Sequence, residues 1–500
     1  MNLFSNILSY LEKNAIGFGN KTALRMNDER LSFAELACKS RAVGAAISAK
    51  GICGQQPIAV LADRSIYTPV LFFGALYSGN YYVPIDPNMP DHKIEVILAD
   101  LNCPLLLAVS RADIKSAVFR NSPVLMTLDE VGDGDTTAVP AGGDAPLFAV
   151  YTSGTTGIPK GIIKSHAAEI SFLEAYCRAF DFSEKDVIGN QTPFFFDASS
   201  KDLYLMLKTG ATMDIVPQEL FMSPYELVSY LNEHNVTFIS WVPTALVIVS
   251  RLNTFSVIKP TTLRKVFFVG EVMPLIHLKK WREALPEVKF VNLYGFSEIA
   301  GIACYQEITG VPQESGFLPI GKPLDNCRVY LVSDGRTITE SGVTGELYLA
   351  SDALAAEYLH SPELTARAFV DYVGEDGASV RCFRTGDLAQ YDQDGCLIFV
   401  SRNDYQIKHM GCRIELGEIE TAAERIPDVQ RACCVYHKKK LQIHLFCEVS
   451  PGASITKHDI REELSKVLSV YMVPGRIDIL PSLPLNSNGK IDRRLLSAEP

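Results

Sequence analysis

Residues 151–161 have the sequence Tyr151-Thr-Ser-Gly-Thr-Thr-Gly-Ile-Pro-Lys-Gly161. The loop follows an apolar stretch and holds four Ser or Thr residues, three glycines and Lys160 in eleven positions. Glycines let a backbone approach a polyanion closely, hydroxyl and amide groups donate to phosphate oxygens, and a lysine adds a point charge. A flexible surface turn is the ordinary alternative, but Pro159 and Lys160 at the end of a Ser/Thr/Gly run after a buried strand disfavour it. The loop therefore predicts a phosphate site, with contacts from Thr152, Ser153, Gly154, Thr155, Thr156 and Lys160.

The spacing of this loop differs from that of the P-loop of nucleoside triphosphatases. The P-loop motif needs Gly, four residues, and then Gly-Lys-Ser/Thr. Here Pro159 stands five positions after Gly154, and Gly161 follows Lys160. The phosphate site is therefore expected to belong to another class of nucleotide-binding protein.

Composition narrows the class of function. A chain of 500 residues exceeds what one hydrophobic core usually organises, so a large domain and a smaller one are expected. The hydrophobic fraction of 47% and the charged fraction of 21% are ordinary for a globular protein. Net charge is 47 minus 58, or −11, and the longest basic run is only Lys438–Lys440, so no nucleic-acid partner is expected. A small-molecule substrate fits better.

Cysteine usage and the start of the chain bear on the compartment. The twelve cysteines include no CxxC pair and are accompanied by no His cluster at metal-ligand spacing, so they are expected to be buried, reduced thiols. No signal-peptide pattern opens the chain, and no run of about 18 apolar residues occurs. The prediction is a cytoplasmic protein with no stable membrane insertion.

Hydrophobic patterning predicts an α/β fold. Apolar runs at 58–61, 148–151, 238–241 and 265–269 alternate with helical patterns, which indicates β-α units and mainly parallel sheets. One helix is expected after His166, with Ile170, Leu173, Cys177 and Phe180 on a single face. Residues 131–144, rich in Gly, Asp and Thr, are the nearest thing to a linker and are expected to separate the first part of the chain from the rest.

The pattern of the sequence changes near Arg402, where a compact stretch begins. A hairpin is expected around 437–440 and an amphipathic helix over 458–468. The polar segment 401–411 would lie between the two units, where hinges are common. We therefore predict a large N-terminal α/β domain at 1–401 and a small α+β domain at 402–500.

Further motifs occur in order along almost the whole chain. They are Leu31-Ser-Phe-Ala-Glu-Leu36, Tyr82-Val-Pro-Ile-Asp-Pro87, Asn292-Leu-Tyr-Gly-Phe-Ser-Glu298, Gly345-Glu-Leu347, Phe383-Arg-Thr-Gly-Asp-Leu388, Ser401-Arg-Asn-Asp404, Gly411-Cys-Arg-Ile-Glu-Leu-Gly-Glu418 and Asn488-Gly-Lys-Ile-Asp-Arg493. Together with the phosphate loop, these motifs make the chain resemble the adenylate-forming superfamily, which includes acyl-CoA synthetases, luciferases and the adenylation domains of nonribosomal peptide synthesis. The resemblance implies a large AMP-binding domain, a small mobile lid domain, and the use of ATP and Mg²⁺.

The resemblance also implies roles for individual residues. Asp387 would accept hydrogen bonds from the ribose hydroxyls, as a carboxylate with two oxygens can. Glu298 would hold Mg²⁺, a hard cation that takes oxygen ligands. The remaining residues expected at the nucleotide are Asn292 and Tyr294 at adenine, Ser297 at the α-phosphate, and Gly295 and Arg402.

Lys490 is the implied catalytic lysine near the end of the chain. It would reach the substrate carboxylate and the α-phosphate and stabilise the charge that builds as pyrophosphate leaves. In members of the superfamily the small domain swings between two half-reactions, first presenting the lysine loop and then the strand region around Gly411. Asp404 matches the hinge position, and the Gly411 loop would line a tunnel for a pantetheine arm.

Two motifs depart from the superfamily pattern. Phe296 and Ser297 stand where Pro-Thr is usual, and Ser401 stands where glycine is usual before Arg402. Ser297 retains a hydroxyl for the phosphate, so activity is expected, whereas Phe296 is expected to alter the turn.

Asp197 indicates the class of acid. Amino-acid-activating members carry an aspartate at this position, and a carboxylate there can pair with an α-ammonium group at low dielectric. Fatty-acid and aryl enzymes generally lack it. We therefore expect an amino acid as the substrate, in a pocket lined by Asp197, Ala198, Lys201, Ser240, Phe267, Val269, Leu293, Gly301 and Ile302.

Lys201 is the unusual member of this pocket. An unpaired ammonium group among apolar side chains is costly, so either the substrate bears a second carboxylate, or Asp202 or solvent neutralises Lys201. Phe267 and Leu293 favour a short substrate side chain, and Val269 replaces the cysteine typical of D-alanine ligases. D-alanine, β-amino acids and acidic amino acids are all candidates.

The length of the chain and the lack of a carrier segment after Lys490 resemble the free-standing D-alanine–carrier protein ligases. The expected partner is therefore a separate, phosphopantetheinylated carrier protein. An acyl- or aryl-CoA ligase is the alternative enzyme, and a degenerate nucleotide-binding scaffold is the non-enzymatic one.

Overall fold

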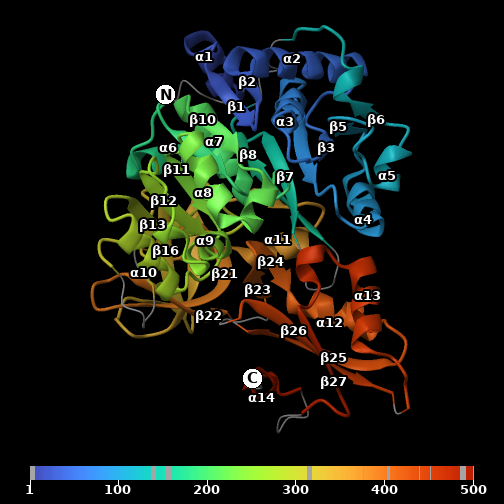
Figure 1. The fold of residues 1–500 in the computed structure, drawn as a ribbon, viewed down its shortest axis with the longest axis vertical. Coiled ribbons are helices and arrows are strands. Elements are labelled where there is room, and N and C mark those ends of the chain that lie inside the picture. Colours follow the sequence, from blue (N-terminus) through green and yellow to red (C-terminus); the bar gives the residue numbers. More distant parts are fainter. Residues whose placement is uncertain are drawn as a thin grey trace.

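The computed structural model describes residues 6–136, 142–152, 159–311, 318–374, 377–402, 406–437, 440–450, 452–484 and 491–498. Six predicted site residues lie outside these ranges, namely Ser153, Gly154, Thr155, Thr156, Asp404 and Lys490. Their roles therefore stay predictions. Figure 1 shows a large body that holds the N-terminal and middle parts of the chain, with the last hundred residues, in red, gathered at the opposite end from the N-terminus.

A nine-stranded sheet forms one layer of the body. Its strands are β1 (Thr22–Met26), β2 (Glu29–Ser32), β9 (Val187–Asn190), β10 (Thr212–Ile215), β11 (Phe238–Trp241), β12 (Lys265–Val269), β13 (Lys289–Tyr294), β14 (Cys304–Glu307) and β15 (Lys322–Pro323). Their order is β15-β14-β13-β12-β11-β9-β10-β1-β2. The pairs from β1 through β10, β9, β11 and β12 to β13 are parallel, as the alternation of apolar runs with helical patterns predicts.

A seven-stranded sheet forms a second layer. Its strands are β3 (Pro57–Leu61), β4 (Tyr81–Ile85), β5 (Leu105–Ala108), β6 (Leu125–Thr127), β7 (Pro146–Thr152), β8 (Lys160–Ser165) and β19 (Glu357–Tyr358), in the order β19-β8-β7-β4-β3-β5-β6. β7 and β8 pair antiparallel on either side of the phosphate loop, and β7 pairs in parallel with β4. The expectation that residues 131–144 separate two parts of the chain is wrong, because strands from both sides of that segment share this sheet.

Helices fill and cover the two sheets. Between the sheets lie α1 (Leu8–Gly17), α2 (Phe33–Ala49), α3 (Thr68–Tyr77), α6 (His166–Ala179) and α7 (Ala198–Thr209), which share one core with both sheets. α3 is buried at all ten positions, as expected for a helix covered on every side. The outer helices are α8 (Pro224–Glu233), α9 (Pro243–Arg251) and α10 (Leu275–Ala284) on the first sheet, and α4 (Asp91–Leu101) and α5 (Ala117–Arg120) on the second.

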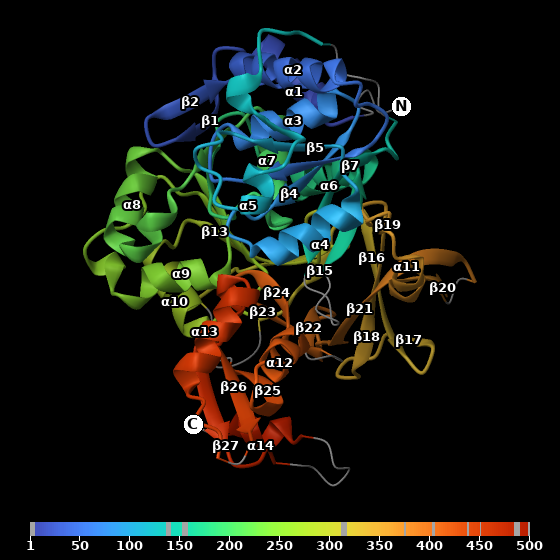
Figure 2. The ribbon, with the colours of Figure 1, turned by 90° about the vertical axis from the view of Figure 1, so that its right-hand side faces the viewer.

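A third sheet and the C-terminal part complete the fold. The third sheet holds β16 (Cys327–Ser333), β17 (Arg336–Ile338), β18 (Gly345–Ser351), β20 (Phe369–Val373), β21 (Ser379–Tyr391) and β22 (Leu397–Arg402), with α11 (Pro362–Ala368) beside it. The C-terminal part holds β23 (Gln406–His409), β24 (Cys412–Glu415), α12 (Leu416–Glu424), β25 (Val429–His437), β26 (Gln442–Val449), α13 (Lys457–Val467), β27 (Arg476–Leu480) and α14 (Arg493–Ala498). Figure 2 shows these two parts next to each other below the two large sheets.

The C-terminal part contains both elements expected there. β25 and β26 form the hairpin predicted around 437–440, and α13 matches the helix predicted over 458–468. The fold is thus the expected α/β body with mainly parallel sheets and a smaller α+β part. The division between 401 and 402 stays a prediction, and β22 runs through Arg402, which pairs with Asp387 of β21.

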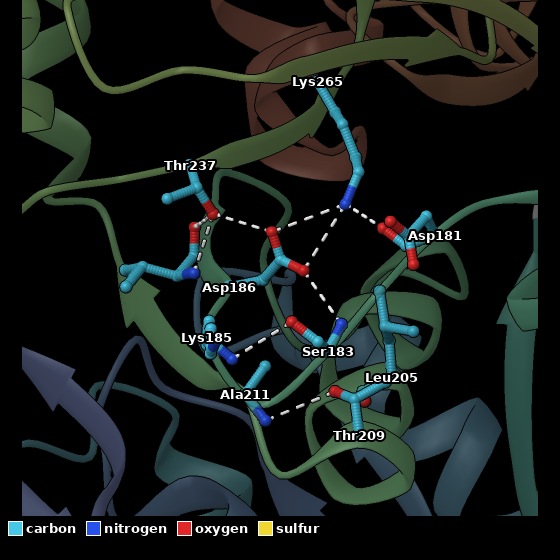
Figure 3. A network of polar contacts seen from close by, with 10 residues as sticks. Asp181, Ser183, Lys185, Asp186, Leu205, Thr209, Ala211, Thr237 and Lys265 are labelled. Carbon is cyan, nitrogen blue, oxygen red and sulfur yellow. Dashed lines mark hydrogen bonds and ion pairs between the residues drawn. The ribbon is translucent and has the colours of Figure 1, made fainter.

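A polar network ties together the starts of three parallel strands (Figure 3). Thr237 before β11 donates to Asp186 before β9 at 2.9 Å, and Lys265 at the start of β12 lies 3.4 Å from the same carboxylate. These bonds fix the amino ends of β9, β11 and β12. The carboxyl ends, where ligands of open α/β sheets bind, lead into the predicted site.

All twelve cysteines are free thiols, as expected, but only seven are buried: Cys38 and Cys53 are exposed, and Cys103, Cys177 and Cys396 are half-buried. Within the described part of the chain, no helix combines the length and the apolar character needed to cross a membrane.

Candidate active site

Three of the predicted nucleotide residues meet at the carboxyl end of β13. The Tyr294 hydroxyl donates to Asp387 Oδ2 at 2.5 Å, and Arg402 forms an ion pair with Asp387 Oδ1. Burial raises the pKa of the Asp387 carboxyl, and the Arg402 charge opposes that rise. The structure therefore brings Tyr294, Asp387 and Arg402 together, bonded to one another in this arrangement.

The turn after β13 has a close approach that requires glycine. A Cβ on Gly295 would lie 2.8 Å from the Gly301 carbonyl oxygen. Phe296, the departure from the superfamily pattern, is 5% exposed and packs its ring 5.1 Å from that of Tyr294. Asn292 donates to the Pro319 carbonyl at 2.8 Å, and Ser297 is half-buried.

Glu298 is buried and held by two side chains. The Tyr358 hydroxyl donates to its Oε1 at 2.6 Å, and Arg413 Nη1 donates to both carboxylate oxygens at 2.7 Å. Burial alone would raise the pKa of Glu298, but the Arg413 charge and the hydrogen bonds outweigh burial and lower it. Glu298 is therefore an ionised carboxylate paired with a guanidinium.

This pairing bears on the Mg²⁺ predicted at Glu298. A guanidinium on both oxygens repels a second cation, so the residues do not fit a metal ion in this arrangement. Among the described residues, no group of three His, Cys, Asp or Glu side chains is placed to hold a metal ion. Mg²⁺ at Glu298 stays a prediction that requires Arg413 to move away.

Lys160 lies at the end of the phosphate loop and faces the C-terminal part. It pairs across the β7–β8 ladder with Thr152, and its Nζ is 4.0 Å from Glu415 Oε1 and 5.9 Å from the Tyr358 ring centre. The loop end and the Glu298 pair therefore face the same hairpin.

That hairpin, β23–β24, enters the site. Lys408 Nζ donates to the Gly295 carbonyl at 3.0 Å, and burial lowers the pKa of Lys408 to about 8 although Asp387 opposes the shift. At the tip, the Gly411 N–H donates to Glu271 Oε1 at 3.1 Å. A Cβ on Gly411 would lie 2.5 Å from Val242 Cγ1, so the tip needs glycine to pass this close to the large body.

Lys408 and Arg413 were not predicted as site residues. Arg413 lies inside a motif used for recognition, and Lys408 stands two positions from Gln406 on the same strand face. The one indication in the sequence was that these two charged residues lie within a short predicted segment of the small domain. Nothing local in the sequence says that these charges reach Gly295 and Glu298.

Asp197, the carboxylate predicted to bind an ammonium group, is already paired. Lys164, at the end of β8 and 0% exposed, forms an ion pair with Asp197 and donates to the Ile299 carbonyl at 2.9 Å. Burial raises the pKa of Asp197, and Lys164 opposes the rise. The Asp197 side chain keeps 14% exposure.

Lys201 is buried, not solvated. Its side chain is 3% exposed and forms an ion pair with Asp202, whose other oxygen accepts from Asn190 at 3.1 Å. Of the alternatives left open for Lys201, the solvated one is wrong, and Asp202 supplies the neutralising charge. An acidic substrate is therefore not needed to balance Lys201.

The other predicted lining residues lie on neighbouring strands. Ser240 pairs with Phe267, and Val269 pairs with Leu293, so these four side chains share one face of the nine-stranded sheet. Phe172 of α6 packs against Gly301, where an added Cβ would lie 2.1 Å from the Phe172 ring. Ala198 is half-buried and Ile302 is buried.

Several polar atoms around this face are buried and have no hydrogen-bond partner within the described part of the chain. They include both carboxylate oxygens of Glu169, the hydroxyls of Tyr176, Ser200 and Ser240, and Asn190 Oδ1. Orphaned buried polar atoms are rare in native proteins and indicate water or a ligand. Glu169 was missed, although its spacing to Leu173 and Tyr176 places it on a buried helix face.

Comparisons with known proteins cover the whole chain. Residues 11–359 match the AMP-binding enzyme family, and residues 418–490 match the AMP-binding enzyme C-terminal domain. Bacitracin synthase 3 of Bacillus licheniformis is 31% identical over 495 residues, which cover 97% of this chain and 8% of that protein. Gramicidin S synthase 2 of Brevibacillus brevis is 32% identical over 482 residues, which cover 95% of this chain and 10% of that protein. The chain thus spans only a small part of the length of these relatives.

Two solved structures have the same fold. Holo-PA1221, described as an NRPS protein containing adenylation and PCP domains, has a TM-score of 0.86 at 21% identity and covers 98% of this chain and 84% of that one. The o-succinylbenzoate CoA synthetase of Bacillus subtilis has a TM-score of 0.83 at 21% identity and covers 98% of each chain.

Proposed function

The chain belongs to the AMP-binding enzyme family, and from this premise we propose that it activates a small amino acid with ATP and passes it to a carrier protein. The first product would be an aminoacyl-adenylate, with release of pyrophosphate. The acceptor would be the phosphopantetheine thiol of a separate carrier protein.

The observation that carries this proposal is the placement of Asp197. Its carboxylate is linked through Lys164 to Ile299, the residue after Glu298, and the Glu298 charge acts on Asp197. A carboxylate this close to the adenylation motif can hold an ammonium group while the substrate carboxylate faces the α-phosphate. A fatty or aryl acid has no ammonium group with which Asp197 could pair.

In the first half-reaction, an oxygen of the substrate carboxylate attacks the α-phosphorus of ATP. The bond from that phosphorus to pyrophosphate breaks, and the electron pair leaves with pyrophosphate. Asp387, Tyr294 and Arg402 would hold the nucleotide, and Lys160 and Lys490 would balance the phosphate charge. Mg²⁺, held by Glu298 after Arg413 withdraws, would supply further charge neutralisation when bound.

In the second half-reaction, the carrier thiolate attacks the carbonyl carbon of the adenylate and AMP leaves. The position of the β23–β24 hairpin supports this second half-reaction, because Gly411 at its tip lies against Val242 and donates a hydrogen bond to Glu271 of the large body. This is the region that members of the superfamily present in thioester formation. Proteins of the same fold include one that joins adenylation and PCP domains, which supports a carrier as acceptor.

The pocket favours a short substrate side chain. The Phe172 ring packs against Gly301, and the Tyr176 ring lies 6.3 Å from that of Phe267, so aromatic side chains fill the space beyond the lining residues. D-alanine and small β-amino acids fit this description. An acidic side chain is less favoured because Asp202 already neutralises Lys201.

ATP–pyrophosphate exchange across a panel of acids tests the proposal. We expect exchange with small amino acids, followed by loading of a phosphopantetheinylated carrier. The alternative, an acyl- or aryl-CoA ligase, is supported by the similarity of the fold to that of a CoA synthetase. Exchange with fatty or aryl acids alone and transfer to free CoA would support that alternative, and exchange with no acid would indicate a nucleotide-binding scaffold.

A further inference from the structure

A buried charge cluster lies beside the predicted amino-acid pocket. Lys164 pairs with Asp197 and donates to the Ile299 carbonyl. Glu169, in the first turn of α6, is fully buried, and neither of its oxygens has a hydrogen-bond partner among the described residues. An ionisable group in this condition needs an explanation, because burying an unpaired carboxylate is costly.

Ionisable groups of neighbouring elements interact electrostatically with Glu169. They are Lys164 from β8, Asp197 from the turn before α7, Tyr82 from β4 and Tyr204 from α7. The two tyrosine hydroxyls bond to each other at 2.6 Å. Burial raises the pKa of Glu169 to about 8, Lys164 opposes this rise, and Asp197 adds to it.

The charge count of the cluster depends on the substrate. Without substrate, Lys164 is matched by Asp197, and a protonated Glu169 leaves the cluster neutral. A substrate ammonium at Asp197 would then be an excess cation in a buried site, which is unfavourable. If Glu169 is ionised, two cations face two carboxylates and the balance is restored.

We propose that Glu169 is a specificity-determining residue that acts through Lys164. When an amino acid binds, Glu169 gives up its proton to solvent. The Lys164 ammonium then interacts partly with the ionised Glu169, which frees Asp197 for the substrate ammonium. The proposal rests on the proposed amino-acid activation and adds to it a second carboxylate. The ligand class is a carboxylic acid with a protonated amine.

Glu169→Gln tests this role, with Glu174→Gln as the matched control. Glu174 lies on the same helix, is 34% exposed and pairs with Lys208, away from Asp197. The measurement is kcat/KM for a small amino acid in ATP–pyrophosphate exchange between about pH 6 and about pH 8.5, a range that spans the raised pKa of Glu169.

The expected sign follows from the free enzyme. In the free enzyme, Glu169 is mainly protonated below about pH 8. Binding of a substrate ammonium group therefore requires the release of this proton. For the native protein, kcat/KM should rise with pH, by up to about tenfold per unit, and level off above about pH 8. The kcat/KM of Glu169→Gln should equal that of the native protein near pH 6 and should not rise with pH. Near pH 8 it should therefore be lower than the native value by about tenfold or more. Glu174→Gln should follow the native profile.

A double variant adds a rescue. Lys164→Met/Glu169→Gln leaves Asp197 alone to meet the ammonium, so its kcat/KM near pH 8 should exceed that of Glu169→Gln. A merely structural role for Glu169 predicts no such recovery. If the double variant does not fold, the pH profile of Glu169→Gln decides by itself.

The outcomes separate this inference from the proposed function. If the native protein exchanges with amino acids but Glu169→Gln runs parallel to it at every pH, the role of Glu169 is overturned and amino-acid activation stands. If the native protein exchanges with no amino acid, both fail.

Discussion

The two halves of the candidate site neutralise their buried carboxylates in different ways. In the nucleotide half, Glu298 is paired with Arg413, which comes from the β23–β24 hairpin of the C-terminal part. In the substrate half, Asp197 and Asp202 are paired with Lys164 and Lys201, which come from the same body as the carboxylates. One half therefore depends on how the C-terminal part is placed, and the other does not.

This difference suggests a division of labour. Cations that arrive with a separate part of the chain can leave with it, so the nucleotide half can change state between half-reactions. Cations built into the large body stay with it, so the ion pairs of the substrate half do not depend on where the C-terminal part lies. Variants that disturb one half or the other test that contrast, from the largest expected effect to the smallest.

Lys490→Ala should remove the cation that the C-terminal part brings to the first half-reaction. We expect amino-acid-dependent pyrophosphate exchange to fall by about 10²–10³, the loss typical of a group that stabilises transition-state charge. The folded state should be intact by thermal unfolding. Exchange close to the native rate would contradict the role assigned to Lys490.

Lys201→Met should leave Asp202 buried and without its cation, with the hydrogen bond from Asn190 remaining. Breaking a buried ion pair on one side costs about 3–5 kcal/mol, so we expect a clear drop in the free energy of unfolding. Lys201→Met/Asp202→Leu should recover much of that loss, because both charges are then removed. A single variant as stable as the native protein would show that the pair is not buried as described.

Arg413→Met should weaken the arrangement in which the hairpin occupies the site. A hydrogen bond to a charged group contributes about 1.5–3 kcal/mol, so aminoacyl transfer to the carrier should slow by about tenfold or more. Pyrophosphate exchange should be spared, because Glu298 is then released.

Arg425→Ala, an exposed position just after α12, is the control for Arg413→Met and should change neither half-reaction. Equal loss of exchange and transfer in Arg413→Met would mean that Arg413 serves both states.

Asp404→Pro should restrict the backbone at the predicted hinge, since proline fixes φ. We expect a several-fold loss of carrier loading and a smaller loss of pyrophosphate exchange. The two rates can be compared on one preparation. A hinge at Asp404 would be refuted by equal reduction of both.

Much of the fold follows from local sequence patterns. The strand patterns at 238–241 and 265–269 coincide with β11 and β12, because parallel buried strands are short continuous apolar runs. The segment 131–144 misled because a Gly-rich composition occurs both in linkers between domains and in connections between strands of one sheet.

The nucleotide half was more predictable than the substrate half for a physical reason. Asp387, Tyr294 and Arg402 lie in motifs whose spacing is visible along the chain, and the structure brings them together. Lys164 and Glu169 lie within apolar elements where a single charged residue is not a motif. Their meaning depends on Asp197, 33 residues from Lys164, which only the folded chain brings within reach.

The central claim is that Asp197 selects an acid that carries an ammonium group. The most direct test compares pyrophosphate exchange for a small amino acid, such as D-alanine or β-alanine, with exchange for propionic acid, which lacks the amine. We expect a strong preference for an amino acid in the native protein and the loss of that preference in Asp197→Asn. A native protein that exchanges with propionic acid as well as with any amino acid, and is indifferent to Asp197→Asn, would contradict the claim.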